Sequence, residues 1–408
     1  MKRTVAPTGE LPHRETKIPG TRTRERSDSK VEGHSSMGRL LSAAMRKKTL
    51  TGTWRTMQPR RSLSSIRSRL LLFVSVCAGA PLVLAQGPQA TPSILAPVST
   101  PAHEIYGLSL FVLLITGAIF AVVAGLMIFV IFKFRARESD PEHEPAQIYG
   151  SVQVELAWTV IPVLIVVVLF LTTARIIFAI QDAAKPKSAL EVTVIGHQFW
   201  WEFRYPRLGI VTANELHVPV STPHQPEPTF LQLLSADVDH SFWVPQLAGK
   251  TDLIPNHPNQ MWIDPQTTGL YLGQCAQFCG IEHAKMLIRV YVDTPQQFDA
   301  WVKNQQQPGA QADTPDAAVD AGRHIFETEA CVNCHTIVGT AAKGTFGPDL
   351  THLMSRATIA AGGAANTPQN LRAWIQDPNT FKPGALMPAM QLSDRQIDEV
   401  VAYLSTLH

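Results

Sequence analysis

Two cysteines and a histidine stand together near the C-terminal end of the chain, in Cys331-Val-Asn-Cys334-His335. Two thiols at this spacing can add to both vinyl groups of a haem, and the adjacent imidazole can bind the iron. A redox disulfide or half of a zinc site would use the same two cysteines. The interpretation therefore depends on the residues that follow.

Two downstream segments favour covalently attached haem c. Phe346-Gly-Pro-Asp-Leu350 follows the Cys-x-x-Cys-His motif at a distance along the sequence that suits a haem-binding domain. Further on, Lys382-Pro-Gly-Ala-Leu-Met387-Pro supplies a thioether. A thioether opposite an imidazole raises the potential of haem iron, which suits an electron carrier rather than an oxygen binder. Met390 competes with Met387 for this role, and we favour Met387 because a Pro-Gly turn sets it on a fixed loop.

A second cluster of metal-binding residue types consists of His240 and the run Cys275-Ala-Gln-Phe-Cys279-Gly-Ile-Glu-His283-Ala-Lys-Met286. One cysteine with two histidines and a weak methionine would describe a mononuclear blue-copper site. A second cysteine allows both sulfurs to bridge two copper ions, each completed by one histidine. Sharing one unpaired electron between two soft-ligated ions keeps bond lengths nearly constant on reduction, as fast electron transfer requires.

Other sites could use the same spacing. They are a tetrahedral Cys2His2 zinc site, a disulfide between Cys275 and Cys279, and a copper-delivery site that holds one ion through the two cysteines and a histidine. Zinc would leave Met286 unexplained, and a disulfide would leave both histidines unexplained. Spacing alone favours dinuclear copper.

Short strands are predicted within residues 182–303, which carry the second cluster. Leu190-Glu-Val-Thr-Val-Ile, Phe230-Leu-Gln-Leu-Leu and Leu287-Ile-Arg-Val-Tyr-Val-Asp alternate in polarity between Pro and Gly clusters. This pattern is typical of an all-β barrel or sandwich.

Helix signals follow the strands. Thr294-Pro-Gln-Gln297 predicts a capped helix with one apolar face made by Phe298, Trp301 and Val302. Residues 304–317 are a low-complexity linker. Residues 318–408 predict a small all-α domain, in which Ser393-Asp-Arg-Gln396 is a capping box before an apolar face made by Ile397, Val400, Val401 and Leu404.

Two apolar runs predict a transmembrane hairpin within residues 86–181. Residues 105–132 carry no charge and exceed the ~20 residues that a helix needs to cross a bilayer. Residues 156–180 form the second run, with Arg175 near its far end, where a long side chain can reach the interface.

Charge fixes the orientation of this hairpin. Lys133, Arg135 and Arg137 follow the first run, so the short connecting loop is predicted in the cytoplasm and the segment after residue 181 outside.

The N-terminal part has a different composition. Residues 1–56 are rich in Arg, Ser, Thr and Lys without an apolar period, which predicts a disordered basic extension. Residues 57–85 have a charged start, a short apolar core and small residues before Gln86, as a secretory signal peptide does. Met57 is therefore a candidate for the true start.

The net charge of +2 conceals an uneven distribution. Residues 1–69 carry 17 Lys and Arg against 5 Asp and Glu, whereas residues 70–408 carry 18 against 28. Because the basic part is a separable block, a uniformly basic nucleic-acid binder is excluded. Five cysteines in 408 residues also exclude a disulfide-stapled scaffold.

Several segments resemble subunit II of haem-copper cytochrome c oxidases. They are Asp239-His240-Ser-Phe-Trp-Val-Pro, Lys250-Thr-Asp-Leu-Ile-Pro, Gly269-Leu-Tyr-Leu-Gly-Gln-Cys275, Glu155-Leu-Ala-Trp158-Thr-Val-Ile-Pro162 and Gly196-His-Gln-Phe-Trp-Trp-Glu. The C-terminal motif resembles the variety with a fused cytochrome c. The resemblance implies a multidomain membrane protein with a two-helix transmembrane hairpin, a cupredoxin-like Greek-key barrel and a small all-α cytochrome c domain.

The resemblance also implies a ligand set for dinuclear copper, the CuA centre. Its members are His240, Cys275, Cys279, His283, Met286 and the backbone carbonyl of Gln277. Most family members have Glu at this last position, where the side chain helps bind magnesium at the boundary with subunit I. Gln277 offers only a neutral oxygen, which argues against magnesium here.

Three further residues have two interpretations each. Glu155 matches the family's glutamate at the mouth of a proton-uptake path, or it is an ordinary interfacial carboxylate. Trp200 and Trp201 are an aromatic relay or core packing. Relatives that accept electrons from a separate cytochrome c have Trp where this chain has Phe199. Electron uptake from a free cytochrome through a tryptophan at this position is therefore not expected. A tethered donor would not need that tryptophan.

Both soluble domains are acidic. Residues 182–308 hold 8 basic and 12 acidic side chains, and residues 309–408 hold 6 and 10. The domains therefore cannot steer each other by opposite fields, and the linker instead supplies an effective concentration on the order of millimolar. The acidic haem domain also predicts a donor that does not dock through an acidic site.

The resemblance implies a subunit of a respiratory terminal oxidase. With the predicted signal peptide and hairpin orientation, we expect it in the bacterial inner membrane, with both metal domains on the periplasmic face. Electrons would pass from a donor such as a cytochrome or a cytochrome bc complex through haem c and CuA to the haem of subunit I. Oxygen reduction and proton translocation would occur in that partner, with subunit III alongside. The alternatives are a copper subunit of a nitric oxide reductase and a copper-delivery protein, while quinol oxidase subunits lack these copper ligands.

Overall fold

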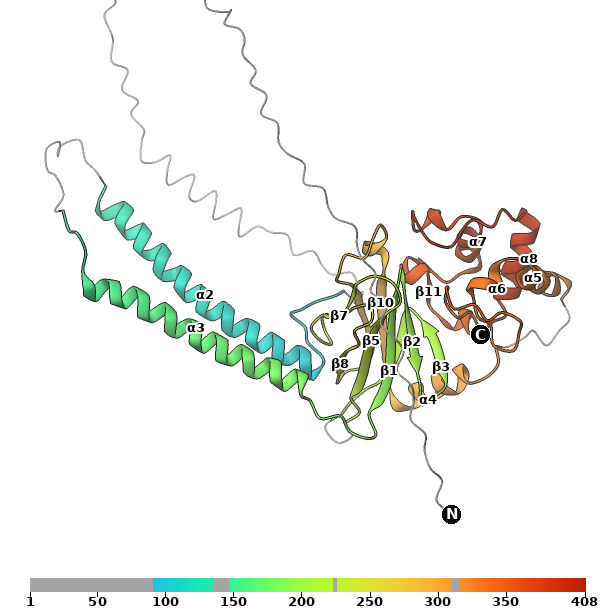
Figure 1. Cartoon of the computed structure of the whole chain (residues 1–408), viewed down its shortest axis with the longest axis horizontal. Coiled ribbons are helices and arrows are strands. Elements are labelled where there is room, and N and C mark those ends of the chain that lie inside the picture. Colours follow the sequence, from blue (N-terminus) through green and yellow to red (C-terminus); the bar gives the residue numbers. More distant parts are fainter. Residues whose placement is uncertain (1–90, 136–146, 223–225, 310–315) are drawn as a thin grey trace, which may run out of the picture. The chain divides into compact units, whose positions relative to one another are not determined.

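The computed structural model describes residues 91–135, 147–222, 226–309 and 316–408 (Figure 1). The predicted basic extension (residues 1–56) and signal peptide (residues 57–85) lie outside the described residues. The described chain forms a helical hairpin, a β-barrel and a small helical domain, in the order predicted from the sequence.

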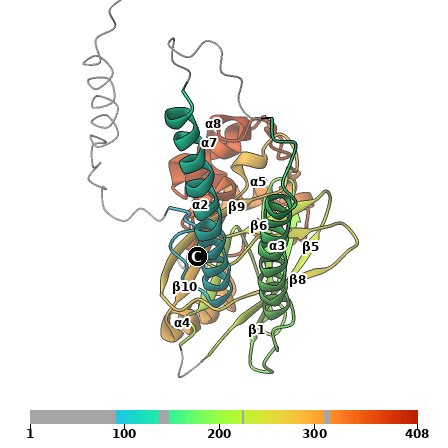
Figure 2. The same ribbon diagram turned by 90° about the vertical axis from the view of Figure 1, so that its left-hand side faces the viewer.

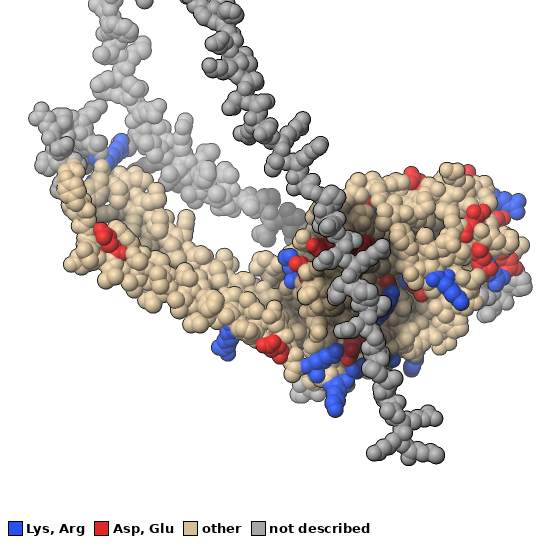
Figure 3. Space-filling model, viewed as in Figure 1, with Lys and Arg blue, Asp and Glu red and all other residues tan. Residues whose placement is uncertain are grey.

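The hairpin consists of α2 (Thr100–Lys133) and α3 (Val152–Gln181), which lie side by side (Figure 2). Both are long and apolar enough to cross a membrane, and Figure 3 shows them almost free of charged side chains between their ends. Each helix is slightly longer than the apolar run that predicted it. The extra residues at the start of α2 include Pro101, whose fixed φ suits the first turn of a helix.

Hydrogen bonds join both ends of the hairpin to the barrel. The Trp262 indole donates to the carbonyl of Ile180 over 2.8 Å, and the Asp264 amide donates to Ser99 Oγ over 2.8 Å. The start of α2 and the end of α3 are therefore both held by hydrogen bonds to residues of the barrel.

The barrel has two five-stranded sheets, in the orders β3-β2-β1-β5-β8 and β4-β10-β9-β6-β7. The pairs β1–β5 and β4–β10 are parallel, and the other pairs are antiparallel. The strands are β1 (Leu190–His197), β2 (Trp200–Tyr205), β3 (Ile210–Ala213), β4 (Glu215–Pro219), β5 (Thr229–Ser235), β6 (His240–Trp243), β7 (Thr251–Leu253), β8 (Asn259–Ile263), β9 (Gly269–Cys275) and β10 (Leu287–Asp293).

Alternation of side chains along the strands builds the core between the sheets. On β10, Ile288, Val290 and Val292 are buried, and their neighbours are half-buried. Trp201 and Phe203 of β2 fill the same core. β-Branched and aromatic residues suit such half-buried strands, so the predicted all-β domain forms as a cupredoxin-like barrel.

Helix α4 (Pro295–Gln305) closes this domain. Its predicted start is confirmed, because Thr294 Oγ1 accepts from the Gln297 amide and the Gln297 side chain accepts from the Thr294 amide. The helix extends two residues into the predicted linker.

The helical domain contains α5 (Ala317–Thr328), α6 (Cys331–Cys334), α7 (Pro368–Gln376) and α8 (Asp394–Leu404), with short strands β11 (Thr358–Ile359) and β12 (Ala364–Ala365). The capping box at Ser393 and Gln396 and the buried apolar face of α8 are confirmed. Helices α5 and α8 touch at Gly322, where an added Cβ would lie 1.8 Å from the Glu399 carbonyl oxygen.

Candidate metal centre and haem pocket

Neighbouring elements at one end of the barrel bring the predicted copper ligands together. His240 begins β6 and Cys275 ends β9, and these strands pair with each other. Cys279 lies in the loop after β9. His283 begins the short helix η1 (His283–Lys285), and Met286 immediately precedes β10.

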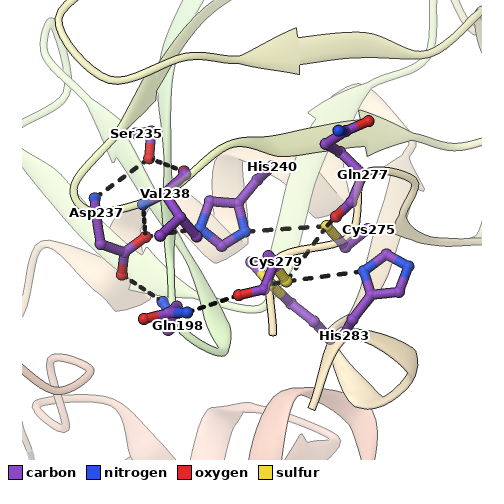
Figure 4. Close-up of polar contacts among 10 residues, drawn as sticks. Gln198, Ser235, Asp237, Val238, His240, Cys275, Gln277, Cys279 and His283 are labelled. Carbon is purple, nitrogen blue, oxygen red and sulfur yellow. Dashed lines mark hydrogen bonds and ion pairs between the residues drawn. The ribbon is translucent and has the colours of Figure 1, made fainter. Parts of the chain in front are cut away.

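The distances between donor atoms are those of ligands that share metal ions (Figure 4). Cys275 Sγ lies 3.9 Å from both Cys279 Sγ and His240 Nδ1. Cys279 Sγ lies 3.7 Å from His283 Nδ1 and 3.9 Å from Met286 Sδ. Bonds of about 2.0 Å to nitrogen and 2.3 Å to sulfur place two ligands of one tetrahedral ion about 3.5–3.8 Å apart.

The two histidines lie beside different sulfurs. The donor atoms of His240, Cys275 and Cys279 are within 4.8 Å of one another, and His283 is not part of that group. A single tetrahedral ion would require all four donors to be mutual neighbours. The arrangement instead fits two ions bridged by the two sulfurs.

The two thiols share a hydrogen bond that shifts their pKa values in opposite directions. Hydrogen bonding with Cys279 lowers the pKa of Cys275 to about 3, and the same contact raises the pKa of Cys279 far above its ordinary value. Both are buried, so two thiolates there need compensating positive charge. Soft thiolate and thioether donors beside imidazoles suit copper, so the residues fit the predicted metal.

The backbone carbonyl of Gln277 faces the same centre. Its oxygen lies 3.2 Å from Cys275 Sγ, while its side chain points away in Figure 4. The carbonyl oxygen, and not the side chain, therefore lies toward the predicted copper site.

Asp237 orients His240. Its Oδ1 lies 2.8 Å from His240 Nε2, which leaves Nδ1 facing Cys275. Although burial alone would lower it, the pKa of His240 is raised by its hydrogen bonds to Asp237 and Cys275. Asp237 was not predicted from the sequence, although a carboxylate three positions before a ligand histidine is the signal that could have identified it.

The haem motif lines a cavity in the helical domain. Its wall contains Cys331, Cys334 and His335 together with both Met387 and Met390. The cavity therefore brings the predicted residues together, and either methionine is placed to be the second iron ligand. Much of the remaining lining is apolar, as a porphyrin requires.

His335 is held in one orientation. Its Nδ1 lies 2.8 Å from the Pro348 carbonyl, which directs Nε2 to the other side of the ring. A Cβ at Gly347 would lie 2.6 Å from this imidazole, so the Phe346-Gly-Pro segment can pack on the ring only with glycine. Burial lowers the pKa of His335, which favours the neutral form that binds metals.

The barrel completes the cavity wall. Gln198, Phe199 and Trp200 line the cavity beside the haem motif. The Gln198 side chain also donates to the Cys279 carbonyl over 2.6 Å. The segment therefore touches both predicted cofactor sites, a connection that the sequence analysis did not find.

The other predicted residues have different surroundings. The Trp201 ring is fully buried and packs edge-on against the imidazole of His240, with centroids 6.0 Å apart. The Trp200 ring stacks on His197 at 4.2 Å. Glu155 lies exposed in the first turn of α3.

Family models match three segments of the chain. The transmembrane domain of cytochrome c oxidase subunit II matches residues 92–176, its periplasmic domain matches residues 210–292, and cytochrome c matches residues 319–408. These segments correspond to the hairpin, the barrel and the helical domain.

Curated relatives carry the same family name. Cytochrome c oxidase subunit 2 of Alkalihalophilus pseudofirmus is 32% identical over 83% of this chain and 95% of that protein. The subunit 2 of Bacillus sp. PS3 is 35% identical over 67% of this chain and 80% of that protein. A crystal structure of the periplasmic domain of subunit II of cytochrome oxidase from Bradyrhizobium japonicum is 30% identical, covers 30% of this chain and 96% of that one, and has a TM-score of 0.28.

Membership has consequences for the whole chain. The family implies copper in the periplasmic domain, haem in the cytochrome domain, a membrane location and assembly with the catalytic subunit of a haem-copper oxidase. The chain belongs to the cytochrome c oxidase subunit II family, in the form that carries a C-terminal cytochrome c domain, and is the subunit at which electrons reach a terminal oxidase.

Proposed function

We propose that this chain carries electrons from a covalently bound haem c to a dinuclear CuA centre and on to the haem of subunit I, where O2 is reduced to water with proton translocation. One observation carries the proposal. A two-thiol site, with each histidine beside a different sulfur, lies against the same segment of barrel that lines the cavity with the Cys-x-x-Cys-His motif.

The copper site is built for little rearrangement. Cys275, Cys279, His240 and His283 would hold the two copper ions, and Met286 and the Gln277 carbonyl would be the weaker donors. The buried ligands come from paired strands and a tight loop, which would limit their movement when the copper ions change oxidation state.

The haem site has a corresponding division of roles. Cys331 and Cys334 would hold the haem through thioether bonds, and His335 and Met387 would bind its iron. Haem and copper, when bound, supply one-electron chemistry. The protein keeps His335 neutral through burial and oriented through Pro348.

The membrane location and the partners of the chain follow from the predicted topology and the family. The two helices would anchor the chain in the bacterial inner membrane, with both metal domains on the periplasmic side. Subunit I and subunit III would be membrane partners, and a cytochrome or cytochrome bc complex would be the donor. Glu155, near the start of α3, would face the proton-uptake path of subunit I.

Metal counting on the purified oxidase tests the proposal. The wild-type complex should show a broad near-infrared copper band and a c-type haem that remains on this chain after denaturation. Cys275→Ser with Cys279→Ser should remove the band and two copper ions per haem c, while leaving the haem. Cys331→Ser with Cys334→Ser should release the haem and leave the near-infrared band.

Other results would point to the alternatives. Loss of one copper ion, with no near-infrared band in the wild type, would indicate a copper-delivery site. A complex that consumes nitric oxide rather than O2 under reducing conditions would indicate a nitric oxide reductase.

A further inference from the structure

A carboxylate of the barrel is bound by the backbone of the helical domain. Glu215 begins β4 and is 2% exposed. Its two carboxylate oxygens accept from the Ala357 amide at 3.0 Å, the Thr358 amide at 2.9 Å and Thr358 Oγ1 at 2.7 Å. Three hydrogen bonds to a charged acceptor therefore join two domains that are far apart in sequence.

The charge of Glu215 has partial compensation on both sides. Arg289 of β10 lies 3.8 Å from the carboxylate. Arg356, the residue before the first amide donor, is buried and donates to the Asp349 carbonyl. Undocking would remove three donors from the carboxylate, and hydrogen bonds to a charged acceptor are stronger than those between neutral groups.

The backbone beside this contact is shaped to fit the barrel. Ala360 and Ala361 both have positive φ, 54° and 55°, a conformation that costs energy for residues with a Cβ. It places Ala361 against Trp200 and Ala213, where all three are buried. A strained turn that is kept where it touches another domain points to a defined docking surface.

A second contact lies at the segment that joins the two cofactor sites. The Lys382 ammonium, 4% exposed, donates to the Phe199 carbonyl over 2.7 Å. Lys285 of the barrel donates in the opposite sense, to the Phe381 carbonyl over 2.7 Å. The loop that carries the predicted axial Met387 is therefore attached to the barrel from both sides.

These contacts fix a short route between the predicted cofactors. Phe199 and Gln198 line the haem cavity, and Gln198 donates to the carbonyl of the copper-ligand residue Cys279. Electron transfer weakens steeply with distance, so the route is effective only while the haem domain stays seated.

We infer that Glu215 is a positioning residue that holds the haem domain in one docked, electron-transferring position, so that internal transfer needs no search by the tethered domain. The inference rests on the proposed function. In each transfer, the haem iron loses one electron and the copper pair gains it.

Flash-induced reduction of the haem in the intact oxidase, followed at the haem and copper bands, tests this role. In the wild type, transfer should be a single phase that does not change with solvent viscosity. In Glu215→Ala, we expect transfer at least tenfold slower and slowing further as viscosity rises, because the domain must dock again. Haem and copper spectra should not change.

Two further variants sharpen the test. Glu191 forms solvent-accessible ion pairs with Lys185 and Arg207 of the same barrel. Glu191→Gln is the matched control and should transfer electrons at the wild-type rate. Thr358→Val removes only the side-chain donor and should slow transfer by a smaller factor, which keeps the test available if Glu215→Ala does not fold.

The outcomes separate the inference from the proposed function. Wild-type rates without viscosity dependence in both Glu215→Ala and Thr358→Val would overturn the role of Glu215. Missing cofactor bands, or no transfer between the centres in the wild type, would overturn the proposed function itself.

Discussion

The orientation of the buried ligand His240 depends on one partly exposed carboxylate. Asp237 contacts the imidazole through Oδ1 and accepts the Gln198 amide on Oδ2 over 2.6 Å. A carboxylate behind a ligand histidine fixes the tautomer and makes the ligand nitrogen more basic. The residue therefore supports copper binding without contacting the metal.

Asp237→Asn should weaken copper binding by about 10–100-fold, the usual effect of losing such a partner. Titration of the copper-depleted oxidase against a competing chelator would measure it. Asp239→Asn, an exposed substitution two residues along, is the matched control and should bind copper as the wild type does. Equal affinities in the two variants would contradict the role of Asp237.

Lys382 is the residue whose titration should make the haem potential depend on pH. Burial lowers the pKa of this ammonium to about 8, and the side chain lines the haem cavity. Below that pH the group is charged, which disfavours the more positive oxidised haem and raises its potential. As pH rises through 8 the charge is lost, and the potential should fall.

Potentiometric titration of the haem between pH 6 and pH 10 would reveal this fall in potential. It corresponds to a free-energy change of about 1 kcal/mol for a charge held near the haem in a protein interior. Lys382→Met should have the lower potential throughout and lack the step near pH 8. Lys343→Met, which removes an exposed lysine of the same domain, should keep the step. A step of equal size in Lys382→Met would show that another group titrates.

At the scale of elements, the haem domain depends on the close approach of α5 and α8. Gly322 permits it, because any Cβ there would lie 1.8 Å from the Glu399 carbonyl oxygen. The clash is with backbone, which cannot move aside as a flexible side chain can. Phe326 and Tyr403 then pack edge to face beside the crossing, with ring centroids 5.9 Å apart.

Gly322→Ala should therefore destabilise the haem domain by at least about 2 kcal/mol, as overpacking does in well-packed cores. Denaturant unfolding followed by haem absorption would measure the loss. Ala317→Val, at an exposed position of the same helix, should change stability by no more than about 0.5 kcal/mol. An unchanged midpoint in Gly322→Ala would mean that the helices can separate at little cost.

At the scale of the whole molecule, charge should govern reduction of the haem by its donor. The docked structure should govern the internal transfer from haem to copper. Both metal domains carry an excess of acidic residues, so attraction between their net charges cannot explain their contact. The same acidic surface favours a basic donor. The two steps should therefore respond differently to salt.

Raising ionic strength should slow reduction of the haem by its donor and leave internal transfer unchanged, because screening acts on exposed charges over about 10 Å at 0.1 M salt. Stopped-flow reduction and flash experiments on one preparation would separate the two rates. Neutralising basic surface groups of the donor should mimic added salt. A donor reaction insensitive to both treatments would exclude electrostatic docking.

Local patterns determined much of this protein. The apolar runs, alternating strands and capping boxes at Thr294 and Ser393 each depend on neighbours within a few residues, so the sequence alone predicted the hairpin, the barrel and the helical domain. The spacing of Cys275, Cys279 and His283 predicted a metal site for the same reason, since most of its ligands share one loop.

The tertiary structure decided which distant residues meet. Asp237, Glu215 and Lys382 belong to no motif, and their roles come from contacts with His240, Ala357 and Phe199 that only folding brings about. Phe199 shows the difference most directly. The sequence showed a missing indole, whereas the structure places this residue on the haem cavity wall, because docking of two domains is set by surfaces that no local pattern encodes.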